Sequence, residues 1–421
     1  MTLAGIASRV HTAAGWLTPR RIRVHAICLA LCAWTVVAVD FSTPGLTDRG
    51  GNIKFQDFLQ FYIAGRQIDR GDIAHLYDPA TAAADLQSLL GHATTVRLPP
   101  VYGPQVGLFF LPLSRLSFFE AAIAWTGVSV ILYLFCCYIV WRACPGLRAR
   151  PGLLALAVCA YPPFFHFVIR GQLSALILAC FVAAFYALRS GRQFLAGFLL
   201  GFLVFKPQFL LGILALFFLA RAGKSFAGAV FAVLLQLGFT WMYFGRAVMS
   251  AYARTLWHLP QVTAIEEPGP SLAQMHSLRS FWLLLVGQPV VALGLYVISS
   301  ALILGLAVAS WRRRGPLALR FSALVVAAVL VNPHLFVYDL LVLAPAVLLL
   351  ADWAIQNAAD SRVAALRVLL YLACLLPLLG PVTKWTHLQL SVPVFVLLQW
   401  MLWDIMRRDA PAIAQVSATI A

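Results

Sequence analysis

The polar residues of this chain that could do chemistry stand at the borders of long apolar segments. One group is QDFLQFYIAGR at 56–66, which places Asp57 close to Tyr62 and Arg66. A carboxylate held beside a membrane surface can act as a general base toward a hydroxyl group. The structural alternatives are an acid at the start of a helix, which the helix dipole favours, and a surface carboxylate. The residues alone leave these interpretations of Asp57 open.

Three further positions place cations, or a potential cation, beside apolar segments: Lys206, Arg170 and His334. A lysine at membrane depth is costly, so Lys206 either binds an anion such as a lipid phosphate or extends to the interface. Proline follows it directly and breaks the helix there. Arg170 either binds a phosphate or anchors the chain among lipid headgroups. His334 can hydrogen-bond a phosphate or a sugar hydroxyl, or it is a packed interfacial histidine.

The stretch NPHLFVYD at 332–339 joins two apolar segments. A helix beginning there would place His334 and Tyr338 on one face, because they are four residues apart, with Asp339 turned partly away. Asp339 lies further into the apolar segment and needs a partner. It is either a paired structural acid or a catalytic one.

Motifs typical of nucleotide- and metal-dependent enzymes are missing from the sequence. It contains no P-loop, no Rossmann glycine pattern, no HExxH and no GxSxG. The eight cysteines lie in or beside apolar runs, and none has metal-ligand spacing with histidine. We therefore expect no metal ion and no other cofactor.

The composition indicates a membrane protein. Of 421 residues, 62% are hydrophobic and 11% are charged, whereas about a quarter of a soluble domain is charged. A net charge of +16 would suggest nucleic acid as the partner of a soluble protein. Here the lysines and arginines form short clusters between apolar runs, which is the pattern that sets membrane topology. We expect contact with membrane lipid and no nucleic acid.

The basic clusters predict how the chain crosses the membrane. Each is expected to be cytoplasmic, so an even number of crossings separates it from the next. Since a span needs about 20 apolar residues, the predicted fold is an all-α integral membrane protein with about 12 transmembrane helices. The spans are expected near 24–40, 117–141, 152–168, 172–189, 194–206, 208–221, 225–244, 289–310, 317–332, 334–351, 364–381 and 389–406.

One transmembrane domain is expected at 24–406, between a cytoplasmic N-terminal segment at 1–23 and a cytoplasmic tail at 407–421. Two extracytoplasmic loops, 41–116 and 245–288, interrupt it. Seven of the twelve aspartates lie at positions 40–85, in the first loop or directly before it, and the spans are almost free of acids. The chemistry is therefore expected on the extracytoplasmic side.

The first loop is itself predicted to be helical. Residues 55–70 contain no proline and predict a short helix lying at the membrane interface. Helical spacing puts Asp57 on one side of this helix, with Tyr62 and Arg66 on another. A second helix is predicted over 80–90.

Five blocks, in order, are similar to the polyprenol-phosphate-mannose-dependent mannosyltransferases, which are classified as glycosyltransferase family 87 of the GT-C fold class. The resemblance extends over roughly residues 25–405. The blocks are DFLQFYIAGRQIDRGDIAHLYDP at 57–79, VYGPQVGLFFLPLSRL at 101–116, GQ at 171–172, LAGFLLGFLVFKPQ at 195–208 and NPHLFVYDLLVLAPAVLLL at 332–350.

The resemblance implies an inverting enzyme with a GT-C-type helical bundle. It would transfer a sugar, mannose by resemblance, from a polyprenyl-phosphate-linked donor to a glycan or glycolipid acceptor outside the cytoplasm. By position, Asp57 matches the acid that acts as base and Lys206 the lysine of the family's KP block. His334 matches a polar position in a block that often reads tryptophan-aspartate-histidine. This chain has asparagine and proline before His334 instead, which leaves the identity of the sugar open.

The chemistry of such a donor fits these residues, because a phosphate is a good leaving group. One base can deprotonate the acceptor hydroxyl, and cations can stabilise the charge left on the phosphate. We expect the donor phosphate at Lys206, His334 and Arg170. The other substrate-binding residues are expected to be Arg66, Tyr62 and Gln172.

We expect a multi-pass protein of the cell membrane, specifically the bacterial inner membrane. Its active site is expected on the extracytoplasmic side. Two alternatives remain from the sequence. One is a transporter or flippase of lipid-linked sugars, and the other is a structural subunit whose active site has decayed.

Overall fold

The structure of the protein is a computed structural model that describes residues 3–91, 101–266 and 271–420. The described residues form α-helices and short 3-10 helices, and they contain no β-strand, only two isolated backbone bridges. The predicted all-α architecture is confirmed for this part of the chain.

The helices follow one another along the whole described chain. The α-helices are α1 Leu3–Trp16, α2 Pro19–Phe41, α3 Phe58–Asp69, α4 Pro79–Leu90, α5 Pro104–Phe110, α6 Phe118–Arg142, α7 Pro151–Cys159, α8 Pro162–Arg170, α9 Ser174–Arg189, α10 Gln193–Gly201, α11 Pro207–Leu219, α12 Gly223–Glu266, α13 Leu278–Val286, α14 Pro289–Arg312, α15 Leu317–Leu330, α16 Ala344–Gln356, α17 Val363–Leu375, α18 Gly380–Thr386 and α19 Ser391–Ile420. The 3-10 helices used below are η1 Ile73–His75, η2 Leu113–Arg115, η4 Phe202–Phe205, η5 Leu272–Gln274 and η6 Val337–Leu343.

Several of these helices are long and apolar enough to cross a membrane. Within the described residues, six meet this condition: Pro19–Phe41, Phe118–Arg142, Gly223–His258, Pro289–Arg312, Val337–Gln356 and Val363–Thr386. A seventh span results if α7 and α8, which meet at a bend of 45°, cross together. Helices α9, α11 and α15, and α10 together with η4, are apolar but shorter. The chain is a multi-pass membrane protein, and the predicted number of about twelve spans stays a prediction.

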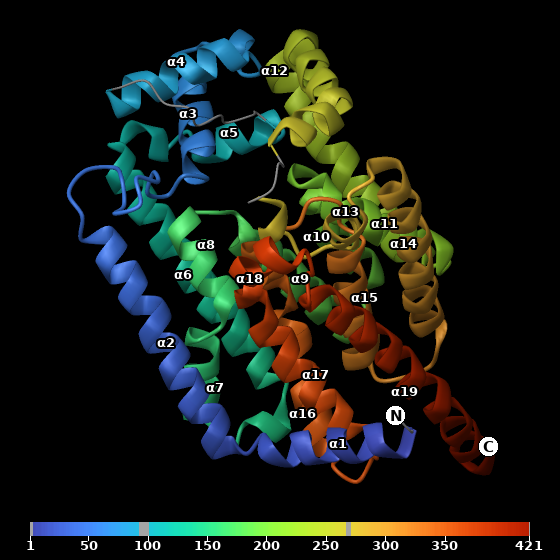
Figure 1. Ribbon diagram of the computed structural model, residues 1–421. Coiled ribbons are helices and arrows are strands. Elements are labelled where there is room, and N and C mark those ends of the chain that lie inside the picture. Colours follow the sequence, from blue (N-terminus) through green and yellow to red (C-terminus); the bar gives the residue numbers. More distant parts are fainter. Residues whose placement is uncertain (1–2, 92–100, 267–270, 421) are drawn as a thin grey trace.

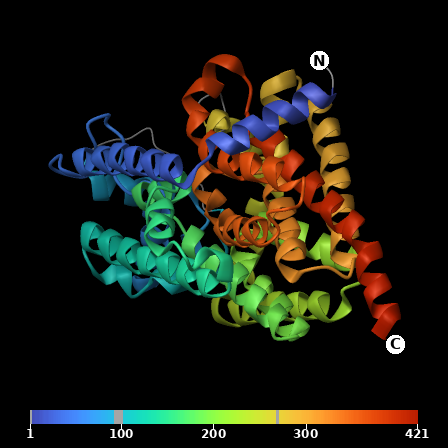
Figure 2. The same ribbon diagram turned by 90° about the horizontal axis from the view of Figure 1, so that it is seen from below.

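Both ends of the chain lie at one end of the molecule (Figure 1). Helix α1 lies across this end and packs on α17, and the view from below shows it crossing the bundle (Figure 2). At the opposite end lies the cap, by which we mean α3, α4 and α5 with the described loops between residues 42 and 117.

The cap has an aromatic core. The rings of Phe58, Phe61 and Phe110 pack together at centroid distances of 5.2 and 5.7 Å, and Trp125 of α6 closes the cluster at 4.8 Å from Phe110. Eight of the twelve residues of α3 are buried. Protein therefore covers most of the helix predicted at 55–70, and its position at the membrane interface stays a prediction. Apolar side chains surround α3 on more than one face, so it is buried between α5, η2 and α6.

Helix α12 extends from the bundle to the cap. It bends at Gly245, whose backbone has φ 75° and ψ 178°, and then continues to Glu266. Beyond the bend Val248 packs with Ile68 and Leu76 of the cap. The first half of the predicted loop 245–288 is therefore helical, because its apolar residues recur at helical spacing and have the cap to pack against.

The helix break predicted at Lys206–Pro207 is confirmed. Lys206 has a non-helical backbone conformation, and α11 begins at the proline. The preceding α10 is held against α12 by small residues, since a Cβ on Gly197 would lie 1.8 Å from the carbonyl oxygen of Ser225. This close contact fixes a helix that is too short to span by itself.

The core of the bundle surrounds α15, whose residues Phe321–Leu330 are all buried. The 3-10 helix η6 packs against α15, α16, α8 and α9, and all seven of its residues are buried. Polar side chains on η6 are consequently inside the protein and need partners there.

Candidate active site

Asp57 lies at the start of α3, but its side chain does not cap the helix. Its Oδ2 atom accepts a hydrogen bond of 2.8 Å from Nε2 of Gln172, and its Oδ1 atom lies 3.9 Å from a guanidinium nitrogen of Arg170. The side chain is 19% exposed. The carboxylate is thus directed at the α8–α9 junction, held from one side and still open to an incoming group.

Gln172 connects the cap to the membrane bundle. Its side chain is buried, and its Nε2 atom also lies 3.3 Å from the hydroxyl of Tyr338 on η6. Its Oε1 atom accepts hydrogen bonds from the hydroxyl of Tyr102, at 3.4 Å, and from the backbone N–H of Leu173, at 3.2 Å. Side chains from three segments distant in sequence, Asp57, Tyr102 and Tyr338, therefore meet at one amide, and this amide holds the Asp57 carboxylate in place.

A glycine makes this approach possible. Gly171 ends α8 with φ +68°, and a Cβ at this position would lie 2.8 Å from the Cβ of Phe58. Trp125 donates a hydrogen bond of 3.0 Å to the Gly171 carbonyl oxygen. Both the left-handed backbone and the lack of a side chain are needed for the start of α3 to reach Gln172.

Arg170 is the accessible cation beside Asp57. Its guanidinium donates a hydrogen bond of 3.1 Å to Oε1 of Gln56, and the side chain is 33% exposed. A guanidinium that is partly held and partly open can bind a phosphate with its remaining N–H groups.

Lys206 is paired inside the protein. Its Nζ atom lies 2.5 Å from Oδ1 of Asp339, and the two side chains are only 5% and 1% exposed. The backbone N–H of Phe336 donates to the other carboxylate oxygen. The alternative that Lys206 extends to the interface is therefore wrong. Lys206 is the partner that Asp339 was predicted to need inside an apolar segment. Nζ also lies 5.5 Å from the ring centroid of Tyr338, so the pair packs beside the residue that contacts Gln172.

His334 lies in a turn, not in a helix. Residues 332–336 have no helical conformation, so the expectation that His334 and Tyr338 share a helix face is wrong. Pro333 disfavours a helical backbone at Asn332, the residue before it. The two side chains are joined by a third ring instead, because Phe336 lies 5.0 Å from His334 and stacks at 5.4 Å on Tyr338.

Tyr62 and Arg66 occupy another side of α3. Their predicted proximity is confirmed, since the guanidinium lies 5.8 Å from the tyrosine ring centroid. The Tyr62 hydroxyl donates to the Leu116 carbonyl oxygen at 2.7 Å, and burial raises its pKa. The structure places Tyr62 against Leu116 and against Phe118 of α6, with Arg66 over the Tyr62 ring, and it does not bring either residue to Gln172.

Residues 101–333, more than half of the 421-residue chain, match the family model of glycosyltransferase family 87. The chain belongs to glycosyltransferase family 87. It is therefore a membrane glycosyltransferase, with a sugar donor and an acceptor as substrates. No curated protein and no solved structure matches it. The matched range contains Gln172 and Lys206, whereas Asp57 and His334 lie outside it.

Two residues of this glycosyltransferase site were not singled out from the sequence. Tyr102 follows a run of prolines, and its hydroxyl reaches Gln172. Burial raises its pKa, with a further contribution from the carboxylates of Asp339 and Asp57, so it remains a hydrogen-bond donor. Gln56 is the hydrogen-bond partner of Arg170, and nothing in the sequence except its position next to Asp57 would have pointed to it. The Lys206–Asp339 pair could have been found, because two opposite charges in apolar segments are each costly alone.

The arrangement offers one carboxylate and one cation to a substrate. Within the described residues, no group of three histidine, cysteine, aspartate or glutamate side chains gathers where it could hold a metal ion. The protein groups present can remove a proton from a hydroxyl and stabilise a negative charge nearby.

Proposed function

We propose that this membrane glycosyltransferase transfers a sugar, mannose by family resemblance, from a polyprenyl-phosphate-linked donor to a glycan or glycolipid acceptor. Asp57 acts as the general base in a single displacement that inverts the anomeric centre. A single displacement needs one base and no protein nucleophile. The observation that supports this best is the carboxylate of Asp57, held at 2.8 Å by buried Gln172 and still partly exposed.

The donor phosphate is proposed to bind first at Arg170, because that guanidinium is partly exposed and lies 3.9 Å from Asp57. Charge that develops on the leaving phosphate would be stabilised there. Lys206 and His334 are proposed as further phosphate-binding residues. Lys206 can contribute only if the phosphate competes with Asp339, its partner at 2.5 Å.

The active site is proposed to face the outside of a bacterial inner membrane, within one domain at 24–406 flanked by cytoplasmic segments. The basic clusters favour this orientation. The cap lies at the end of the molecule opposite the two termini (Figure 1).

A transfer assay with several donors tests the proposed reaction. Purified enzyme in liposomes is supplied with polyprenyl phosphates carrying radiolabelled mannose, glucose or galactose, and with membrane glycolipid extract as acceptor. We expect label to appear in the glycolipid from one of these donors, without added metal or nucleotide. Movement of intact donor across the bilayer with no transfer would identify a transporter instead.

A further inference from the structure

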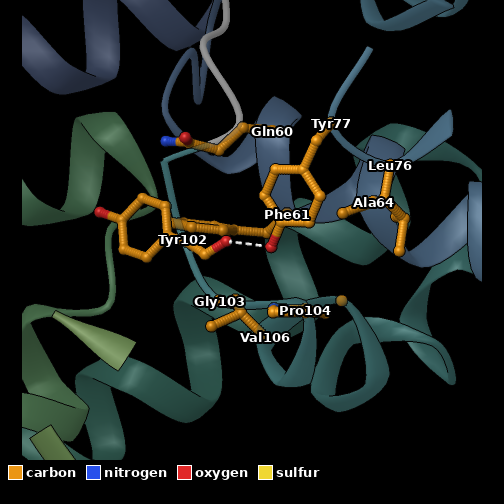
Figure 3. Close-up of a pocket in the computed structure, with 10 residues that line it drawn as sticks. Gln60, Phe61, Ala64, Leu76, Tyr77, Tyr102, Gly103, Pro104 and Val106 are labelled. Atoms are coloured by element: carbon orange, nitrogen blue, oxygen red, sulfur yellow. Dashed lines mark hydrogen bonds between the residues drawn. The ribbon is translucent and has the colours of Figure 1, made fainter. Parts of the chain in front are cut away.

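A pocket in the cap shares one residue, Tyr102, with the site described above (Figure 3). It is formed where α3, η1 and the start of α5 meet, and its volume is about 40 Å³. Since a water molecule needs about 10–15 Å³ of such space, it can hold a few waters or one edge of a sugar ring. Its walls are formed by Gln60, Phe61, Ala64, Leu76, Tyr77 and Tyr102, together with Gly103, Pro104, Val106 and Gly107.

Two of the lining residues connect the pocket to the base. Gln60 donates from Nε2 to the Asp57 carbonyl oxygen at 3.2 Å, which leaves the rest of its amide for a ligand. Tyr102 forms a wall with its ring, while its hydroxyl reaches Gln172, the residue that holds the Asp57 carboxylate. In Figure 3 the Gln60 amide and the Tyr102 hydroxyl point to the same side of the pocket.

The pocket is rigid at its aromatic end. The Tyr77 hydroxyl donates to the Tyr102 carbonyl oxygen at 2.8 Å, and the Phe61 and Tyr102 rings pack edge to face at 4.9 Å. Burial raises the pKa of Tyr77, so its hydroxyl stays protonated and the hydrogen bond persists at neutral pH. Because these side chains are already fixed, they lose little conformational entropy when a ligand binds.

A buried amide beside the pocket has unmet hydrogen-bonding capacity. Neither polar atom of the Gln105 side chain has a partner among the described residues, although both are buried. The amide lies directly against Gly103, one of the pocket walls. A buried amide without partners is unfavourable. Gln105 does not itself line the pocket, so a ligand hydroxyl can satisfy this amide only if the side chain turns past Gly103.

We propose that this pocket binds the acceptor sugar, which deepens and rests on the function proposed above. Aromatic rings contact the C–H face of a sugar, and amide groups exchange hydrogen bonds with its hydroxyls. A sugar with its edge between Gln60 and Tyr102 directs a hydroxyl toward Asp57. The ligand class is a neutral glycan terminus, because the described residues that line the pocket include no charged side chain.

Two substitutions test the pocket without changing Asp57. Gln60→Leu removes the amide, and Ala64→Leu, one turn further along α3, fills the space. The matched controls are Gln87→Leu and Ala83→Leu, which make the same changes on the exposed face of α4. Saturation-transfer NMR with methyl α-mannoside, α-glucoside and β-galactoside measures sugar binding to each full-length protein in nanodiscs.

We expect wild type, both controls and Asp57→Asn to bind at least one glycoside, and both pocket variants to lose at least tenfold in signal. In transfer assays the pocket variants should raise the KM of the acceptor and leave the donor KM unchanged. Equal glycoside binding by pocket variants and controls, or no binding by wild type, would overturn the proposal. Full transfer by Asp57→Asn with glycoside binding intact would refute the base assignment alone.

Discussion

Lys206 and Asp339 illustrate what burial requires of single residues. Their side-chain atoms are 2.5 Å apart and almost wholly inside the protein, so each neutralises the other's charge. Such a pair adds little net stability over an apolar replacement, but losing one partner leaves an uncompensated buried charge. The two positions must therefore either keep opposite charges or both become apolar, whether or not Lys206 also binds the donor phosphate.

Removing one partner should destabilise the protein strongly. We expect Lys206→Ala to lower the free energy of unfolding by about 3–5 kcal/mol, because Asp339 is left buried and unpaired. The double variant Lys206→Met/Asp339→Leu should recover most of this loss. Thermal unfolding of the detergent-purified proteins, followed by circular dichroism, measures both effects.

The double variant also separates structure from donor binding. A donor KM raised at least tenfold in this folded protein would support a phosphate contact by Lys206. A donor KM equal to that of wild type would remove Lys206 from the donor site. A double variant as unstable as the single one would contradict the pairing argument.

At the scale of elements, the junction of α8 and α9 positions the base. Gly171 has φ +68°, and a Cβ added to it would lie only 2.8 Å from the Cβ of Phe58. The same junction carries Arg170 and Gln172, the two residues that contact the Asp57 carboxylate. Displacing α3 here would separate Asp57 from both.

A methyl group at this junction should impair transfer more than stability. We expect Gly171→Ala to reduce the transfer rate at least tenfold, because the start of α3 must move away. Gly91→Ala is the matched control, since that glycine has φ +74° but no described atom within 4 Å of an added Cβ. Each left-handed alanine costs roughly 1–2 kcal/mol. Equal transfer rates for the two variants would show that the contact with Phe58 is unimportant.

His276 forms a second connection between elements, and its protonation makes this connection sensitive to pH. His276 is buried, and its ring hydrogen-bonds Ser391 at 2.8 Å while its backbone N–H reaches the Leu335 carbonyl oxygen. It thereby ties the segment before α13 to the start of α19 and to the loop that carries η6. Burial, with His166 nearby, lowers the pKa of His276 to about 3 from an ordinary 6.5.

The lowered pKa makes the folded protein sensitive to mild acid. Between pH 3 and 6.5 the unfolded chain binds this proton and the folded one does not, so stability falls as the pH falls. We expect His276 to account for a loss of about 2 kcal/mol between pH 7 and pH 5. In His276→Gln this part of the pH dependence should vanish, as measured by thermal unfolding at each pH. An unchanged pH dependence in the variant would contradict the argument.

For the whole molecule, the sequence predicted the helical class and most helix positions. Its apolar runs mark the helices, and the break at Lys206–Pro207 follows from proline. The contacts of the site could not be predicted in the same way. Asp57, Gln172 and Tyr338 meet only because three distant segments fold together. Periodicity also did not predict how much of α3 is buried, because it does not reveal that α5 and α6 cover the helix.

The orientation of the molecule in its membrane can be tested with fusions. We expect green fluorescent protein fused to either terminus to fluoresce, because both termini are proposed to be cytoplasmic. Alkaline phosphatase fused after Leu90, at the end of α4, should be active, because the cap is proposed to lie outside. An inactive phosphatase there would place the cap, and with it the active site, in the cytoplasm.

The central claim is that Asp57 removes the proton from the acceptor hydroxyl, and one comparison tests it directly. Asp57→Asn keeps the shape of the side chain and its place beside Gln172 but cannot act as a base. Asp69→Asn, at the exposed end of the same helix, is the control. Sugar transfer from lipid-phosphate donor should fall by about 10²–10⁴-fold in Asp57→Asn and stay at the wild-type rate in Asp69→Asn, with donor binding kept in both. Wild-type transfer by folded Asp57→Asn would contradict the claim.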